Sequence, residues 1–477
     1  MLIGRQLRLV ASLCLVACGA GISGARAAAQ TQPVLMLSDV HFDPFRDPAK
    51  FDALQKAPAS EWASVLSKPA ASAQIEEFQK LAKACPSRGI DSDWPLFKAS
   101  LEQSRKRIAS PAFITVTGDM MAHEFECRYA ALGGKPAEYP AFAAKTVAFV
   151  ALQIRAAYPK TPTYIALGNN DSGCGDYRED PDSAFLRADA LALSPLAQSD
   201  TDKIAHEASR RGDWSVDLPA PFKDARLLVL QDIFESTHFK SCGGKPDRDG
   251  AAEQVAWLKA QLQQAREQHK QVWVIGHIAP SIDAYNTIIG GHQVCKGESA
   301  SMLLGDDHLG STLIAYADVV RLALFAHTHM DEMLALHDGD RSVAVKIVPS
   351  ISPINGNHPA FTMADVETSS FILKDYAVYV APNIAGAGEW SEEYRYSSTY
   401  HLPAYDAAAA NTLTAGFLHD QASQTASSQA YEKYFFPGDG GKRAMVMKLL
   451  WPAYACATAT YTSEGYRKCA CDAAAAK

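Results

Sequence analysis

The sequence predicts an α/β fold followed by a smaller, mainly helical C-terminal region. Between Pro33 and Phe361, short apolar runs alternate with amphipathic helical segments, which is the pattern of α/β proteins. After Phe361 the chain becomes rich in Ala, Tyr and Ser. The composition, 48% hydrophobic and 21% charged, is that of an ordinary folded protein, and 477 residues suffice for one large core plus a smaller unit.

Seven short apolar runs are the strand candidates of the α/β part, and four longer amphipathic segments are its helix candidates. The strand candidates are residues 34–38, 112–117, 163–167, 227–231, 271–275, 321–325 and 343–348. The helix candidates are residues 71–85, 96–109, 140–158 and 251–269.

The C-terminal region is expected to contain one strand, residues 371–381, and helices within residues 404–434 and 442–454. We therefore place an α/β domain at residues 33–365. Residues 366–477 are expected to form a cysteine-containing subdomain of one strand and several helices.

The N-terminus is typical of an export signal. Two arginines precede an apolar stretch from Leu9 to about Ala17, which is too short to span a membrane comfortably. An A-x-A site at residues 25–27 would remove a signal peptide of residues 1–27 and release a soluble protein. Residues 15–19 resemble the lipobox of bacterial lipoproteins, which would end the signal at residue 17 and leave Cys18 lipidated. Either interpretation places the protein in the periplasm or outside the cell.

Eight cysteines follow the leader, and an even number in an exported chain predicts disulfides. The pairing is not readable from the sequence, but local closure of Cys456 with Cys469 or Cys471 is the first expectation. A zinc knot at Cys469 and Cys471 is the weaker alternative, because a C-x-C motif lacks a second close pair.

The net charge of −8 and the absence of a basic stripe with interleaved aromatics argue against a nucleic-acid partner. The aromatic residues Tyr394, Tyr396, Tyr400, Phe435 and Phe436 are compatible with lipid contact but are more typical of a core. The sequence leaves the oligomeric state open.

Five short polar motifs follow predicted strands, where open α/β sheets bind their ligands. Singly each is weak, because a lone histidine is usually structural and a lone Gly-Asp is usually a turn. These ordinary explanations do not account for five such motifs in this order along one chain. The motifs are Ser38-Asp39-Val40-His41, Thr117-Gly118-Asp119, Leu167-Gly168-Asn169-Asn170-Asp171, Ile275-Gly276-His277 and Phe325-Ala326-His327-Thr328-His329.

The residue types in these motifs indicate a binuclear metal centre. Asp, Asn and neutral His are suitable ligands for Zn, Fe or Mn. Two divalent ions about 3.5–4 Å apart can bind both the attacking and the leaving side of an in-line displacement at phosphorus. One carboxylate must bridge them. The set therefore predicts hydrolysis of a phosphate ester or anhydride.

In this order the motifs resemble those of the calcineurin-like metallophosphoesterase family, over about residues 34–361. The resemblance implies a four-layer α/β/β/α sandwich of two mixed sheets, with a smaller helical subdomain after it. It also implies two divalent ions, Zn first and otherwise Fe, Mn or Co, and a metal-bridging hydroxide that attacks phosphorus. Asp119 would be the bridging carboxylate. The ligands of the first metal would be Asp39, His41 and His329, and those of the second Asn169, His277 and His327.

A narrower resemblance is to the acid sphingomyelinase-like phosphodiesterases and their endopolyphosphatase-type relatives. It rests on His123, four residues after Asp119, on Pro280 after the Gly-His motif, on the loop at residues 349–353, and on the cysteine-bearing C-terminus. This resemblance makes His123 the candidate acid that protonates the leaving oxygen.

One departure from the family pattern affects the substrate. Asn170 stands where the family usually has histidine, and an amide can donate a hydrogen bond to a phosphoryl oxygen but cannot act as an acid near neutral pH. Either His123 acts alone, or the leaving group needs little protonation, as in a phosphoanhydride.

Three functions therefore stay open: a sphingomyelinase-like phosphodiesterase acting on a small-molecule or lipid-derived substrate, a phosphoanhydride hydrolase of endopolyphosphatase or nucleotide type, and a metal-binding surface protein without turnover. His292 and Tyr285 are the candidates for substrate contact.

Overall fold

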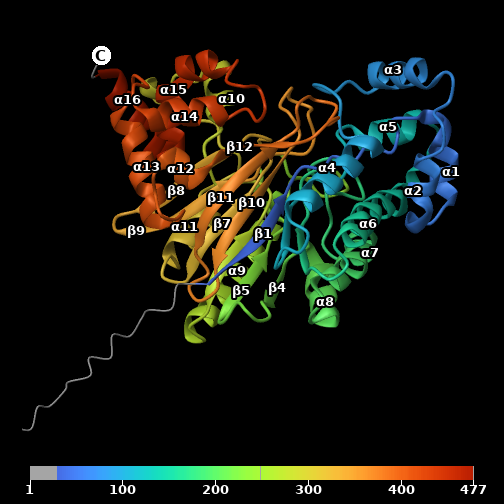
Figure 1. Cartoon of the computed structure of the whole chain (residues 1–477), viewed down its shortest axis with the longest axis horizontal. Coiled ribbons are helices and arrows are strands. Elements are labelled where there is room, and N and C mark those ends of the chain that lie inside the picture. The colour runs from blue at the N-terminus through green and yellow to red at the C-terminus, as the bar shows by residue number, and fades with distance from the viewer. Residues whose placement is uncertain (1–29, 248, 476–477) are drawn as a thin grey trace, which may run out of the picture.

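The computed structural model describes residues 30–247 and 249–475, so both predicted cleavage sites and Cys18 lie outside the described residues. Two six-stranded sheets form the centre of the molecule (Figure 1). The first sheet has the order β12-β11-β10-β1-β2-β3, with β1 (Thr31–Leu37), β2 (Ile114–Thr117), β3 (Thr163–Ala166), β10 (Ala360–Glu367), β11 (Leu373–Val380) and β12 (Ser391–Arg395). The second has the order β4-β5-β6-β7-β9-β8, with β4 (Trp214–Asp217), β5 (Ala225–Val229), β6 (Gln271–Ile275), β7 (Val320–Phe325), β8 (Glu332–Asp338) and β9 (Arg341–Ile347).

Both sheets are mixed, as predicted. In the first, β1, β2 and β3 are parallel, whereas β10, β11 and β12 pair antiparallel. In the second, β5, β6, β7 and β9 are parallel, and the edge strands β4 and β8 are antiparallel to their neighbours. The parallel strands therefore bring the loops that follow them to one edge of each sheet.

The strands divide their side chains between separate cores, because successive residues point to opposite faces. On β1, Val34 and Met36 pack between the two sheets, while Leu35 and Leu37 pack against helices. Strand β6 alternates in the same way between the inter-sheet core and a helical layer on the other side. The protein is thus a four-layer α/β/β/α sandwich, as the resemblance implied.

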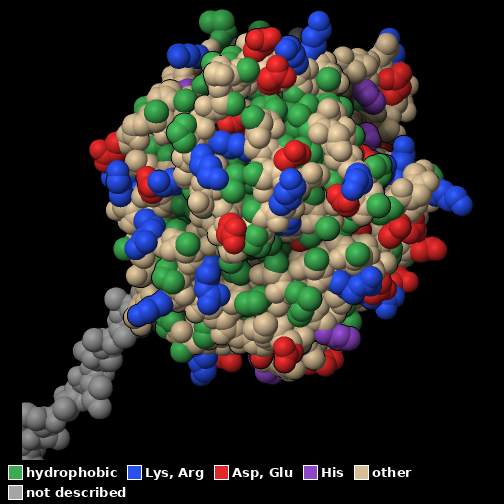
Figure 2. Space-filling model, turned by 90° about the vertical axis from the view of Figure 1, so that its right-hand side faces the viewer, with side chains coloured by type: hydrophobic (Ala, Val, Ile, Leu, Met, Phe, Trp, Pro, Cys, Tyr) green, Lys and Arg blue, Asp and Glu red, His purple; other side chains and the backbone are tan. Residues whose placement is uncertain are grey.

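Helices from the N-terminal half cover the first sheet, and α9 and α11 cover the second. The helices that contribute buried side chains to the core on this side are α1 (Phe51–Lys56), α2 (Trp62–Leu66), α3 (Gln74–Ala84), α4 (Trp94–Arg107), α5 (Phe125–Ala131), α6 (Tyr139–Ala157) and α7 (Ala184–Leu193). The other helices of this part are α8 (Thr201–Arg211), α9 (Asp249–Glu267), α10 (Ala284–Ile289) and α11 (His308–Ala315). Figure 2 shows acidic and basic side chains interspersed over the face seen from the right of Figure 1, as on an ordinary solvated surface.

The C-terminal helices pack against β8 and β9 and against one another. They are α12 (Tyr396–Tyr400), α13 (Ala407–His419), α14 (Ala426–Tyr434), α15 (Ala444–Ala459) and α16 (Ser463–Ala475). Tyr394, Tyr396, Tyr400 and Phe435 are buried, so these aromatics belong to the core. Within the described residues, no helix combines the length and the apolar character that crossing a bilayer requires.

The domain boundary predicted between residues 365 and 366 needs correction, because it falls inside β10. Strands β11 and β12 then complete the same sheet by antiparallel pairing, so the sheet continues well past residue 366. The mainly helical part begins only at α12. The sequence did not reveal this, since β12 contains two glutamates and an arginine and lacks an apolar run.

Four disulfides join the described cysteines, which indicates an oxidising compartment. The predicted local closure is confirmed, because Cys456 pairs with Cys469. Cys471 pairs with Cys295 and ties α16 to the segment after α10, so neither cysteine of the C-x-C motif is free for a zinc knot. The other two pairs are Cys85–Cys127 and Cys174–Cys242.

Candidate metal centre and cleft

The five polar motifs follow β1, β2, β3, β6 and β7, and the structure brings them together at the carboxyl ends of these strands. Backbone hydrogen bonds join the first two loops: the amide of Asp39 donates to the carbonyl of Gly118 (3.1 Å), and that of His41 to the carbonyl of Asp119 (2.9 Å). These backbone hydrogen bonds therefore fix the two loops relative to each other without any contribution from side chains.

Five of the predicted ligands have left-handed backbone. Asp39, His41, Asp119, His327 and His329 have φ values between 41° and 72°. Such values are strained for residues with a Cβ atom, and they persist where the surrounding structure enforces them, often at functional sites. Each of the loops after β1, β2 and β7 thus holds at least one predicted ligand in this strained conformation.

The side chains form two clusters that share one carboxylate. Oδ2 of Asp119 lies 3.4 Å from Nε2 of His41 and 3.2 Å from Nε2 of His277. On the first side, Nε2 of His329 is 3.1 Å from Nε2 of His41. On the second side, Oδ1 of Asn169 is 3.0 Å from Nε2 of His277. Asp39 belongs to the first cluster and His327 to the second.

The donor set fits divalent cations. The facing Nε2 atoms of His41 and His329 need a proton or a cation between them. Oδ1 of Asp39 is buried and has no hydrogen-bond partner among the described residues. Nδ1 of His41 lies 2.9 Å from the carbonyl of Met121, and Nδ1 of His277 lies 2.7 Å from that of Thr117. With Nδ1–H donating to these carbonyls, each Nε2 lone pair faces the cluster, as in metal-binding histidines.

A cleft of about 1790 Å³ opens above these clusters. His123, Asn169, His327 and His329 lie on its floor or walls. Its basic lining residues are Arg46, Arg88, Arg178 and Lys240. Its larger apolar lining residues include Met302, Leu303, Met330, Phe435, Phe436 and Tyr454.

Residues 32–331, more than half of the chain, match the family model of the calcineurin-like phosphoesterases. The chain belongs to the calcineurin-like phosphoesterase family. Calcineurin-like phosphoesterases use a dimetal centre, which the two clusters around Asp119 could hold. The predicted enzyme class, a metal-dependent phosphoric ester hydrolase, is thereby confirmed.

Curated relatives in this family are similar to the chain at low identity. The chain is 24% identical over 400 residues to the acid sphingomyelinase-like phosphodiesterase 3b of Mus musculus, covering 80% of this chain and 77% of that protein. It is 24% identical over 324 residues to the sphingomyelinase phosphodiesterase D of Dictyostelium discoideum, covering 66% and 67%. It is 21% identical over 295 residues to the cyclic GMP-AMP phosphodiesterase SMPDL3A of Bos taurus, covering 59% and 61%.

His123 in this calcineurin-like phosphoesterase lies beside the first cluster, with its ring stacked on that of His41 at 4.0 Å between centroids. Its side chain is 31% exposed, and its Nδ1 atom lies 3.1 Å from Oδ1 of Asp91. Asp91 is buried and also accepts a hydrogen bond from the hydroxyl of Ser352 (2.9 Å). Because Asp91 occupies Nδ1, Nε2 is the nitrogen available to a ligand in the cleft.

Asn170 contacts the shared carboxylate. Its backbone amide donates to Oδ1 of Asp119 and its side-chain amide to Oδ2, each at 2.8 Å. Asn170 is buried and is not among the described residues that line the cleft. Its amide group therefore holds Asp119 in place, a role that the sequence did not suggest.

Carboxylates behind the ligands fix the loops, and most were missed by sequence reasoning. Asp171 accepts from the amides of Met120 and Met121, and Asp232 accepts from the amide of His277. Asp176 accepts from Nδ2 of Asn169 (2.7 Å) and so turns Oδ1 of Asn169 toward His277. These contacts depend on folding and leave no local motif.

When no cation is bound, protons on His41 and His277 compensate the negative charge of the Asp119 carboxylate. Burial lowers the pKa of the His277 imidazole, but Asp119 outweighs burial and raises this pKa to about 10. In the same way the pKa of His41 rises to about 9. Burial and the charge of His277 lower the pKa of His327 to about 3. Although burial acts in the opposite direction, His277 and His41 hold the pKa of Asp119 well below its usual range.

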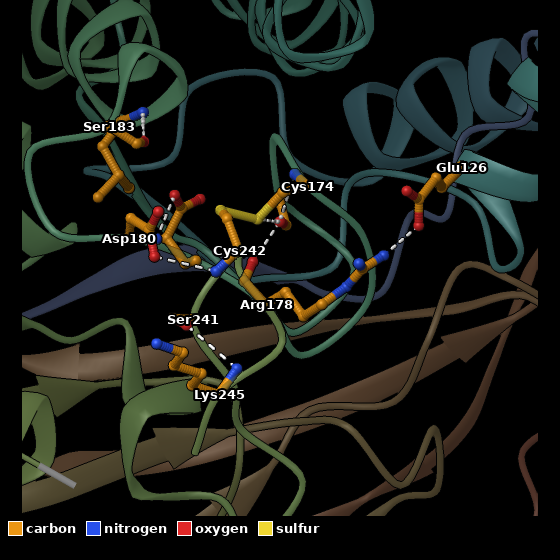
Figure 3. The surroundings of a disulfide bond; sticks show 11 residues. Glu126, Cys174, Arg178, Asp180, Ser183, Ser241, Cys242 and Lys245 are labelled. Atoms are coloured by element: carbon orange, nitrogen blue, oxygen red, sulfur yellow. Dashed lines mark hydrogen bonds and ion pairs between the residues drawn. A yellow bond between two sulfur atoms is a disulfide. The ribbon is translucent and has the colours of Figure 1, made fainter. Parts of the chain in front are cut away.

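A disulfide braces one wall of the cleft. Cys174–Cys242 joins the loop after β3 to the loop after β5, and Arg178 of the first loop extends toward Glu126 (Figure 3). The amide of Lys240 donates to the carbonyl of Tyr177 (3.0 Å), and the Tyr177 hydroxyl lies 3.1 Å from Nε2 of His327. The brace thus positions an aromatic hydroxyl against a predicted ligand.

The two predicted substrate contacts differ in position. Tyr285 lines the cleft and is 49% exposed. His292 is exposed, with Nδ1 2.9 Å from the carbonyl of Ser299, and is not among the described lining residues. Only Tyr285 stands where a ligand in the cleft could touch it.

Proposed function

We propose that this protein is an exported two-metal phosphodiesterase in which His123 protonates the leaving oxygen. The observation that supports this best is the sharing of Asp119 between two buried ligand clusters, with His123 stacked beside one of them. A pair of divalent cations, Zn first and otherwise Fe, Mn or Co, supplies Lewis-acid charge and an activated water.

The chain's own groups position and protonate the substrate. Asn170 holds the Asp119 carboxylate from two sides. Asp91 accepts the Nδ1–H of His123 and orients the ring, so that Nε2 can transfer its proton to the leaving oxygen.

The lining of the cleft favours a phosphodiester with an apolar substituent. Basic side chains can pair with phosphate charge, and the apolar wall that includes Phe435, Phe436 and Tyr454 can bury a hydrocarbon or aromatic group. The names of relatives include phosphodiesterases of sphingomyelinase type and of cyclic GMP-AMP. A small-molecule or lipid-derived phosphodiester is therefore the substrate class we infer.

A phosphoanhydride hydrolase is the second candidate. Two observations favour it: Asn170 replaces a potential acid, and four basic residues (Arg46, Arg88, Arg178 and Lys240) line the cleft and could bind further phosphates. A surface protein without turnover is the third, and the compact arrangement of all seven predicted ligands argues against it.

Hydrolysis of bis(p-nitrophenyl) phosphate by chelator-treated and Zn-reconstituted protein tests the proposal. We expect activity only after reconstitution, its loss in Asp119→Ala, and its retention in His292→Ala, the matched control. Turnover of ADP or polyphosphate but not of diesters would favour the second candidate. A protein with two bound metals that is inert toward all these substrates would favour the third.

Export and the form of the mature N-terminus belong to the same proposal. The four disulfides support passage into an oxidising compartment. Mass spectrometry of the mature chain distinguishes the two cleavage sites. A diacylated Cys18 would establish a membrane-anchored lipoprotein, and a chain beginning after residue 27 a soluble one.

A further inference from the structure

The first half of α15 exposes large apolar side chains to solvent. Met445, Val446 and Leu449 are 77%, 53% and 79% exposed, whereas Met447 and Trp451 on the other side of the helix are buried. The buried side alone accounts for the packing of α15 on the protein. The exposed side chains therefore mark an interaction surface rather than a core.

A neighbouring helix adds to this surface. Tyr285 and Ile289 of α10 are 49% and 60% exposed, and α10 packs against α15 (Figure 1). Both helices also line the cleft, α10 through Tyr285 and α15 through Tyr454. We call the five exposed residues of these two helices the apolar rim: Tyr285, Ile289, Met445, Val446 and Leu449.

The charged residues next to the exposed side chains of α15 are basic, whereas Asp283 caps α10 on the other side of the apolar rim. Residues 440–463 contain Lys442, Arg443 and Lys448 and no acidic residue, although the whole chain has a net charge of −8. Lys448 lies within α15 and Lys442 just before it, and both are exposed. Lysines beside exposed apolar residues are typical of helices that lie in the interface of an anionic bilayer. A partner that fits this surface therefore combines negative charge with an apolar region.

A second copy of the chain fits the apolar rim less well. A two-fold interface pairs a surface with itself, so it would place Lys442, Arg443 and Lys448 of one copy near those of the other. Like charges at close range oppose such pairing. Anionic lipid headgroups supply both the opposite charge and an apolar interior.

We propose that the apolar rim docks this protein onto anionic lipid bilayers, with the first half of α15 and the exposed side of α10 in contact with lipid. Because the same two helices line the cleft, docking would bring the cleft to the membrane surface. This last step rests on the proposed phosphodiesterase function and gives it a membrane-resident phosphodiester lipid as substrate. The docking itself does not depend on that function.

Flotation with vesicles of phosphatidylcholine containing phosphatidylglycerol tests the docking. The full chain is used with Cys18→Ser in every sample, so that lipid attached to Cys18 cannot anchor it. We expect the parent protein to float with the vesicles. The double variant Met445→Glu/Leu449→Glu should bind the vesicles more weakly by a factor of roughly ten or greater. The matched control is Ile75→Glu/Leu191→Glu, since these residues are 70% and 71% exposed on α3 and α7, and it should float like the parent.

Lys448→Glu tests the contribution of charge. It should weaken binding to vesicles that contain phosphatidylglycerol, and added salt should do the same. Equal flotation of the parent, the rim variant and Lys448→Glu would overturn the proposal. A concentration-dependent dimer that the rim variant abolishes, without flotation of the parent, would overturn it in favour of a second copy.

The rim variant also separates docking from catalysis. Its rate on bis(p-nitrophenyl) phosphate should equal that of the parent, because Met445 and Leu449 lie outside the cleft lining. Flotation without any diester hydrolysis would support the docking surface and contradict the proposed phosphodiesterase function. Hydrolysis without flotation would support that function and contradict the docking surface.

Discussion

Nδ1 of His123 lies 3.1 Å from Oδ1 of Asp91, a buried carboxylate on the segment between α3 and α4. His123 opposes burial and lowers the pKa of Asp91 to about 2, so Asp91 is ionised at neutral pH. An ionised, buried partner orients an imidazole firmly. The pair therefore has the geometry of a general acid with its orienting group.

If His123 is the acid, its removal should matter most for poor leaving groups. We expect His123→Ala to lower kcat by about 10²–10⁴ for an alkyl phosphodiester, and by much less for a p-nitrophenyl ester, which leaves without protonation. Initial rates on the two esters measure this. His238→Ala, another histidine in the cleft lining, is the control. Equal losses on both esters would show that His123 does not protonate the leaving group.

Asp91 acts through His123, so its variant should separate kcat from KM. Asp91→Asn keeps the size of the side chain but replaces one acceptor oxygen by an amide, which disturbs the orientation of the ring. We expect kcat on the alkyl ester to fall about tenfold or more with little change in KM and unchanged metal content. A purely structural role would instead lower the Tm and leave kcat per folded molecule unchanged.

The seven predicted ligands could be selected from the sequence because each follows a buried strand in a local motif, and the structure brings them together. The sequence also placed β6 at its observed bounds, since residues 271–275 form an uninterrupted, strongly apolar strand. It could not find Asp91 or its contact with Ser352, because this hydrogen bond joins residues 261 positions apart. No spacing in the sequence records such a contact.

Four observed strands were not predicted from the sequence, and three of them, β4, β10 and β12, have weak or mixed patterns. The fourth, β8, contains the buried apolar run 333–336 and was simply missed. β4 has four residues, and β12 buries only Tyr394 among its five. β10 does alternate, with Ala364 and Val366 buried and Met363 and Asp365 half-buried, but it lies where the predicted domain ended. An alternation test continued past Phe361 would have found it and moved the boundary.

Asn170 should matter for metal affinity rather than for proton transfer, because its side-chain amide donates to Oδ2 of Asp119. Partners that orient a ligand typically contribute 10–100-fold to metal affinity. We expect Asn170→Ala to bind Zn about 10–100-fold more weakly, as measured by competition with a chelating dye. An unchanged affinity combined with a loss specific to poor leaving groups would instead assign Asn170 to the chemistry.

Metal binding should release protons. In the metal-free protein the pKa values of His41 and His277 are raised to about 9 and about 10, so both imidazoles are protonated at neutral pH. A cation must displace these protons, and the apparent affinity therefore increases as pH rises toward these values. Calorimetric titration with Zn in buffers of different ionisation enthalpy should report about two protons released. Affinity that does not change with pH would contradict this assignment.

Stability should decrease with rising pH because of a buried glutamate away from the ligands. Burial, together with the nearby carboxylates of Asp306, Asp232 and Asp213, raises the pKa of Glu235 from 4.5 to about 8. Neither of its oxygens has a hydrogen-bond partner among the described residues. The folded protein thus keeps a proton that the unfolded chain has lost, so this contribution is complete below pH 4.5 and is lost as pH rises to about 8.

Glu235→Gln should remove this dependence, because the amide resembles the protonated acid. At pH 8 the variant should be more stable than the parent by about 4 kcal/mol, and at acidic pH the two should be equal. Urea unfolding across this pH range measures the difference. Glu102→Gln, whose side chain is 61% exposed on α4, is the matched control and should follow the parent at every pH. Parallel curves for parent and Glu235→Gln would show that Glu235 is ionised in the fold, with a cation or water that compensates its charge.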